Sequence, residues 1–143
     1  MGASVSVHWR GITDAQRDAQ PGFWNDDKAW GNWMAERENH DDVELAMVDL
    51  GVGDLLTFTT DGLQDAEVDW VTPGGLESAA LRLRELVLAE DRRVQKIVQT
   101  YALSANRLDP VHEELARDLE DVAQMARYAS AQGARQITLE VNW

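Results

Sequence analysis

The sequence predicts an α+β fold: a two-layer sandwich in which a mainly antiparallel four-stranded sheet is covered on one face by a long αα-hairpin and shorter helices. Four short stretches alternate between apolar and polar residues, as strands with one buried and one solvated face do. Other stretches repeat apolar residues at helical spacing, which gives helices with a single apolar stripe. Elements that each carry one apolar face bury those faces against one another, and two layers result.

Length and composition indicate a single α+β domain over residues 1–143, because a chain of this size buries enough surface to form a core. Of its residues, 44% are hydrophobic and 27% are charged. The chain has no cysteine, which excludes disulfides and thiolate chemistry and fits a reducing compartment. We find no apolar run long enough for a membrane span and no signal segment, so we expect a cytoplasmic protein.

The N-terminal stretch predicts a strand followed by a short helix. Apolar and polar residues alternate from Ser4 to Trp9, which predicts a strand over residues 5–9. The stretch from Thr13 to Gln16 has the form of a capping box, so a short helix should begin there and end before the following proline.

Residues 41–50 fit two interpretations. Val43, Met47 and Leu50 form a stripe at helical spacing that ends at Gly51, behind a possible capping box. The same residues also alternate passably as a strand. The capping residues favour the helix.

A β-hairpin is predicted between residues 54 and 72. Alternating residues give strands over 55–59 and 67–71, and Asp61-Gly62 between them is a typical turn dipeptide. Because the connection is longer than two residues, we expect a bulge or a wider loop.

A long helix is predicted over residues 73–105. Thr72 followed by Pro73 combines a capping residue with a proline at the first helical position. Apolar residues then keep one helical phase from Leu76 to Tyr101, interrupted only by the polar pair at 90 and 91. This continuity favours one bent helix, with two separate helices as the alternative.

The last third of the chain predicts a helix, a glycine stop and a strand. Asp109 and Pro110 should begin the helix and Gly133 should end it. Strict alternation then predicts a strand over residues 136–142. The helix should return along the preceding one and complete the αα-hairpin.

The polar face of the predicted sheet is the first candidate for a binding surface. A solvated sheet face is the simpler interpretation, because antiparallel sheets commonly have one. If the face binds a partner, the register predicts that it displays His8, Thr57, Thr59, Glu67, Asp69, Thr138, Glu140 and Asn142.

The second candidate is an aromatic anchor formed by Trp24, Trp30 and Trp33. Aromatic residues at helical spacing are most often part of a core. Tryptophan is also enriched in the hot spots of protein interfaces, so an exposed anchor is the alternative.

No motif identifies a reaction. His8, His40 and His112 lie on different predicted elements, and the two glutamates after His112 do not extend into the His-Glu-x-x-His zinc motif. The sequence also lacks a nucleophile elbow and the glycine-rich loops that hold phosphates. We therefore predict no catalytic residue, no metal ligand and no cofactor.

The charge of the chain predicts the kind of partner. Its 26 acidic and 13 basic residues give a formal net charge of −13, which repels nucleic acid and anionic membranes. Solubility alone explains such a charge, and attraction to a basic protein is the functional alternative.

The leading functional hypothesis is a small acidic non-enzymatic interaction protein that binds a basic protein partner, as an inhibitor or an immunity-type module does. Two alternatives stay open: a small-ligand or metal-dependent enzyme that uses the polar sheet face, and a structural assembly subunit. A homodimer is compatible with each of them.

Overall fold

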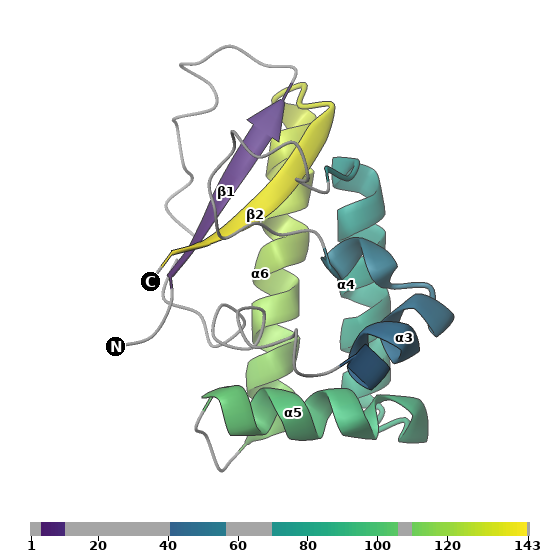
Figure 1. The fold of residues 1–143 in the computed structure, drawn as a ribbon. Helices are drawn as coiled ribbons and strands as arrows, with labels where there is room; N and C mark the ends of the chain where they lie inside the picture. Colours follow the sequence, from purple (N-terminus) through teal and green to yellow (C-terminus); the bar gives the residue numbers. More distant parts are fainter. Residues whose placement is uncertain (1–3, 11–40, 57–69, 106–109, 143) are drawn as a thin grey trace.

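The computed structural model describes residues 4–10, 41–56, 70–105 and 110–142 of the chain (Figure 1). Helices dominate this part of the protein, and one pair of strands flanks them. In chain order the elements are β1 (Ser4–Arg10), α3 (Asp41–Asp49), the 3₁₀ helix η2 (Gly53–Leu56), α4 (Pro73–Leu88), the 3₁₀ helix η3 (Arg92–Val94), α5 (Gln95–Ala105), α6 (Val111–Ala131) and β2 (Gln136–Asn142).

The predicted α+β sandwich with a four-stranded sheet is wrong. Among the described residues, β1 and β2 form a two-stranded antiparallel sheet, which a single bridge from Val71 to Ile137 extends. The predicted strand over residues 55–59 begins instead as η2, in which Leu55 is buried and Leu56 is half-buried. A short alternation cannot distinguish a strand from a tight turn that buries one leucine. Residues 57–69, the rest of the predicted hairpin, lie outside the described residues.

The first and the last of the four predicted strands were predicted correctly, and they are β1 and β2. They pair in a register that runs from Ser4 opposite Asn142 to Arg10 opposite Gln136. This register places the apolar positions of one strand opposite those of the other, as their alternation requires. The sheet therefore joins two ends of the chain that are far apart in sequence, as Figure 1 shows.

Residues 41–49 form a helix, α3, which confirms the favoured interpretation of this segment. After it, Gly51 has a left-handed φ of 77°. The Gly51 N–H donates to the Val48 carbonyl at 3.0 Å, and the Val52 N–H donates to the Met47 carbonyl at 2.9 Å. These two bonds are the Schellman motif, which ends a helix with a residue in the left-handed region.

The start of α4 confirms the predicted cap. The Thr72 hydroxyl accepts a hydrogen bond from the Gly75 N–H at 3.1 Å, and Pro73 occupies the first turn. The Asp54 carboxylate of η2 lies beside Gly75, so closely that a methyl group at that glycine would overlap it. An acidic side chain at this end of a helix is favourable because it faces the positive end of the helix dipole.

The prediction of one helix over residues 73–105 is wrong. α4 ends at Leu88, and Glu90 adopts a φ of 53°. A second Schellman pair follows, in which the N–H groups of Glu90 and Asp91 donate to the carbonyls of Val87 and Leu86, both at 3.0 Å. Apolar residues continue at helical spacing beyond this break because α5 also buries one side against the same core.

The final helix and its stop agree with the sequence prediction to within one residue. Pro110 occupies the N-cap position and α6 begins at Val111, whereas Asp109 lies outside the described residues. At the other end Gly133 has a φ of 90°, and the Ala134 N–H donates to the Ala129 carbonyl at 3.0 Å, again as a Schellman motif.

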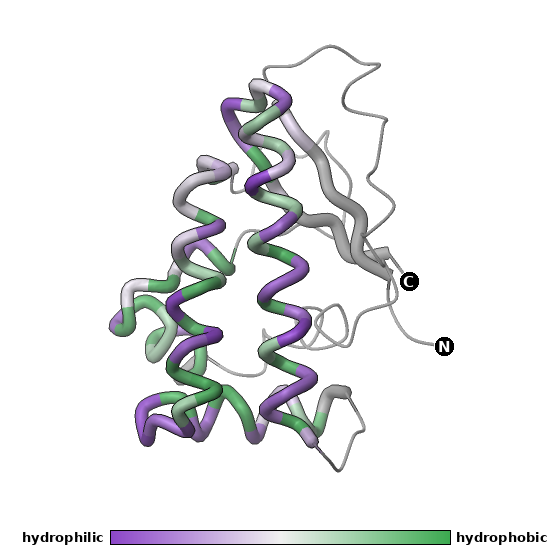
Figure 2. Tube along the Cα trace, turned by 180° about the vertical axis from the view of Figure 1, so that it is seen from behind, coloured by the Kyte–Doolittle hydropathy of each residue, from purple (hydrophilic) through white to green (hydrophobic). Residues whose placement is uncertain are grey.

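α4 is the central element of the helical layer. It runs antiparallel to α6, and α5 crosses the base of this pair (Figure 1). Figure 2 shows hydrophilic and hydrophobic residues alternating along both helices, which leaves one apolar stripe on each to face its neighbours. The αα-hairpin is therefore formed by α4 and α6, with α5 inserted between them in the chain.

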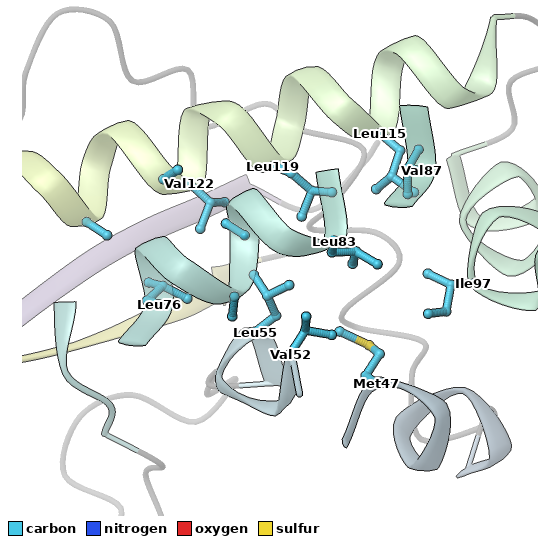
Figure 3. Close-up of a cluster of buried hydrophobic side chains, with 14 of the residues drawn as sticks. Met47, Val52, Leu55, Leu76, Leu83, Val87, Ile97, Leu115, Leu119 and Val122 are labelled. Carbon is cyan, nitrogen blue, oxygen red and sulfur yellow. The ribbon is translucent and has the colours of Figure 1, made fainter. Parts of the chain in front are cut away.

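The core occupies both sides of α4 (Figure 3). On one side its buried residues meet α6, and on the other they meet α3, the loop after it and η2. The labelled side chains that meet there are Leu76, Leu83 and Val87 of α4, Leu115, Leu119 and Val122 of α6, Ile97 of α5, and Met47, Val52 and Leu55.

The sheet is attached to α6 through an aromatic pair. The rings of Trp9 and Tyr128 meet edge to face, with centroids 5.6 Å apart and planes inclined by 70°. Trp9 is fully buried and Tyr128 is half-buried. Edge-to-face packing contributes about 0.5–1.5 kcal/mol beyond the burial of area, so this contact fixes β1 against the C-terminal half of α6.

We expect either Leu83→Ala or Leu115→Ala to lower the free energy of unfolding by about 2–5 kcal/mol, because both side chains are fully buried and leave a cavity when truncated. Leu103→Ala is the matched control, since Leu103 is 80% exposed and should change stability by less than about 0.5 kcal/mol. Urea denaturation measures all three variants. A loss below about 1 kcal/mol for both core variants would contradict the packing of α4 against α6.

Candidate functional site

The structure describes only part of the predicted sheet face. The register pairs His8 with Thr138 across the two strands. Thr138 is fully buried, so its hydroxyl does not face solvent as the alternation predicted. Thr57, Thr59, Glu67 and Asp69 lie outside the described residues, as do the side chains of His8, Glu140 and Asn142. Of the predicted face, the structure therefore describes the side chain of Thr138 alone, and that side chain is buried.

The predicted aromatic anchor also lies outside the described residues, since Trp24, Trp30 and Trp33 fall within residues 11–40. Two other tryptophans can be placed. Trp9 is fully buried in the core, and Trp70 is half-buried just before the bridge at Val71. Neither presents an exposed ring to a partner.

Shallow depressions gather where α4 ends and α6 begins. One, of about 280 Å³, is lined by Glu90, Asp91, Val94, Gln95, Val98, Gln99 and His112. Another, of about 310 Å³, is lined by Leu88, Glu90, Pro110, Val111, His112 and Glu113. Glu90 and His112 line both, so the two depressions adjoin at this corner.

The ionisable groups at this corner favour a structural role. Asp91 accepts hydrogen bonds from the Arg93 side chain at 3.0 Å and from its backbone N–H at 2.9 Å. These bonds lower the pKa of Asp91 to about 2, so the carboxylate is ionised and already paired at neutral pH. Within the described part of the chain, no three histidine, aspartate or glutamate side chains lie close enough together to hold a metal ion.

Comparisons with known proteins do not assign the chain to a family. No protein-family model, no curated protein and no solved structure matches it. Among the described residues, no helix is both long and apolar enough to cross a membrane. Functional inference therefore rests on the charges and exposed surfaces of this chain.

The negative charge is concentrated in one part of the sequence. Residues 11–69 contain 15 acidic and three basic residues, a formal charge of −12 out of the −13 for the whole chain. Residues 70–143 contain 11 acidic and nine basic residues and are nearly neutral. The helices α4, α5 and α6 are thus a nearly neutral framework, and the acidic part includes α3 and η2.

α3 carries exposed apolar residues on the side turned away from the core. Val43, Met47 and Leu50 are buried against the rest of the protein. On the opposite side Leu45 is 66% exposed and Val48 is 57% exposed, one helical turn apart. The flanking acidic residues are Glu44, which is half-buried, and Asp49, which is exposed. We call Glu44, Leu45, Val48 and Asp49 the outer face of α3.

A basic side chain of α4 contacts the C-terminal end of α3. The Arg82 Nε of α4 donates to the Leu50 carbonyl at 2.7 Å. This bond satisfies a carbonyl at the negative end of the α3 dipole. Asp49 adds negative charge at that same end, which disfavours the helix by about 0.3–1 kcal/mol. The position of Asp49 is therefore not explained by the stability of α3.

Sequence reasoning missed this surface. The helical interpretation of residues 41–50 places Leu45 and Val48 off the buried stripe, and this was the signal available. An exposed apolar residue is ordinary on its own, and the pair becomes notable only when both residues lie on one acidic face.

Glu90→Gly should raise the free energy of unfolding by about 1 kcal/mol, because a side chain in the left-handed region is strained and glycine is not. Gly133→Ala, at the equivalent position after α6, should lower it by a similar amount. Thermal and urea denaturation measure both. If Glu90→Gly were destabilising, the Glu90 side chain would make a stabilising contact at the corner that outweighs its backbone strain.

Proposed function

We propose that this chain is a small acidic interaction protein, without catalytic activity of its own, that binds a basic protein partner. The observation that carries the proposal is the concentration of a formal charge of −12 in residues 11–69. A negative charge that served only solubility would not need to be confined to one part of the chain. Charge of one sign attracts a partner of opposite sign before contact and raises its association rate.

The near neutrality of the helical framework supports the same proposal. Ion pairs join α4 and α6, with Arg127 Nε 2.6 Å from Glu77 Oε2 and an Arg84 nitrogen 3.3 Å from Glu120 Oε2. Arg84 and Arg127 therefore pair with acidic residues of the same framework. Residues 41–56 contain five acidic residues and no basic one, and a segment of this composition is complementary in charge to a basic partner.

If the proposal is right, a partner captured by the chain from a native lysate and identified by mass spectrometry carries a net positive charge. Its association rate, measured by surface plasmon resonance, should fall at least about tenfold from low to high salt, because exposed charges are screened beyond roughly 8–10 Å. The dissociation rate should change less, since long-range attraction acts mainly before contact.

Charge reversal in the acidic part provides the control. Glu67→Lys with Asp69→Lys should slow association more than Glu85→Lys with Glu113→Lys, although both pairs change the net charge equally. A partner with neutral or negative net charge would contradict the proposal. So would an association rate that does not respond to salt.

A further inference from the structure

The break between α4 and α5 occurs at a residue whose backbone is strained there. Glu90 adopts a φ of 53°, a left-handed conformation that a side chain disfavours and that glycine adopts freely. The turn is short, since α4 ends at Leu88 and η3 begins at Arg92. α3 and α6 end with glycine at the equivalent position, at Gly51 and Gly133. A straight helix through Glu90 would remove the strain that these glycines avoid.

The apolar residues on the two sides of the break share one heptad pattern. From residue 80 to residue 101, spacings of three and four residues alternate, and Glu90 is the one polar residue in this pattern. The other positions, each at most 1% exposed, are Ala80, Leu83, Val87, Val94, Ile97 and Tyr101. Burial of α5 requires an apolar stripe on α5, but it does not require that stripe to stay in step with the stripe of α4. A pattern that stays in step is the one that a single continuous helix needs.

We propose that the break at Glu90 is a hinge, and that straightening it joins α4 and α5 into one helix through which two copies of the chain exchange α5, α6 and β2. Exchange forms the contacts of the closed chain again between copies, since α4 of one copy packs against α6 of the other, and β1 pairs with β2 in the same way. Short hinges under strain favour such an exchange. This inference goes beyond the proposed function and does not depend on it.

A second copy suits the hinge because the charges of the hinge are self-complementary. Residues 90–93 are two acidic residues followed by two arginines. In the closed chain, Asp91 accepts two hydrogen bonds from the Arg93 side chain, both of 3.0 Å. If two straightened hinges lie side by side in opposite directions at a twofold axis, Glu90 of each copy is opposite Arg93 of the other. The hinge is neutral overall, so it adds no repulsion between the copies.

Two substitutions at position 90 should shift the exchange in opposite directions. Glu90→Gly relieves the strain of the closed hinge and weakens a continuous helix, so it should raise the dissociation constant of the dimer at least about tenfold. Glu90→Leu removes the polar residue from the heptad pattern and should lower that constant at least about tenfold. The full chain is refolded from urea at high concentration, and size-exclusion chromatography with light scattering then measures monomer and dimer over an equilibrated dilution series.

Glu85→Leu is the matched control. It replaces an exposed glutamate of α4 by the same residue, away from the hinge. As a surface substitution, it should leave the dissociation constant within about twofold of that of the parent chain.

A disulfide shows which copy contributes each strand of the sheet. The chain has no cysteine, and Ser6 pairs with Glu140 across β1 and β2, at a Cα separation that a disulfide can bridge. In the chain carrying Ser6→Cys and Glu140→Cys, the disulfide should form within the chain in the monomer fraction and between copies in the dimer fraction. Non-reducing gel electrophoresis of the separated fractions distinguishes the two.

A dimer whose disulfides form within each chain would overturn the inference, because the copies would then associate without exchange. Equal dimerisation of Glu85→Leu and Glu90→Leu would also overturn it, since any exposed leucine would suffice. Absence of a dimer from both the parent chain and Glu90→Leu, after refolding at high concentration, would overturn it as well. If circular dichroism shows that Glu90→Leu does not fold, the parent chain with the two cysteines decides the question in the same way.

Discussion

The packing of α4 between two partners is the interaction on which the rest of the structure depends. Leu83 and Val87 lie on the stripe that faces the core, and α6 covers that stripe from one side while α3 and η2 complete the cover from the other (Figure 3). A helix buried in this way has little freedom to rotate or slide, because both sets of contacts would change at once. The α4–α6 pair therefore determines where α3, α5 and the sheet can attach.

Three helices, α3, α4 and α6, end with the same backbone geometry. After α3, α4 and α6 the backbone enters the left-handed region at Gly51, Glu90 and Gly133. Each ending directs the next segment back towards the core, to Val52, Val94 and Ile137 in turn. Two of these positions are glycines, for which the conformation costs little, whereas Glu90 adopts it with a side chain. Glu90 lines both shallow depressions found where α4 ends and α6 begins.

The sequence predicts an element correctly where its capping residues and its apolar periodicity indicate the same structure. Thr72 with Pro73, Gly51 and Gly133 mark helix boundaries through the chemistry of single residues, and the structure confirms each of them. The break at Glu90 was missed because glutamate is an unusual residue for a left-handed helix ending. The strand predicted at Leu55 was wrong because a few alternating residues carry too little periodicity to exclude a 3₁₀ turn.

The candidate site was less predictable than the fold. Whether Leu45 and Val48 are exposed depends on which side of α3 meets α4, and no local pattern records that choice. The confinement of negative charge to residues 11–69 is visible in the sequence, but its meaning depends on the near neutrality of the helices beside it. Together these features describe a nearly neutral framework of helices beside an acidic helix, α3, on which Leu45 and Val48 are exposed.

Native-state hydrogen exchange tests most directly whether α4 and α6 form one cooperative unit. If they do, the central amides of both helices exchange only through global unfolding and report the same free energy. The amides of α3 exchange at that value or below it, because α3 contacts the unit from outside. Full protection of α6 together with exchange of α4 at a clearly lower free energy would contradict the account, since α4 would then be a peripheral element and not the centre of the fold.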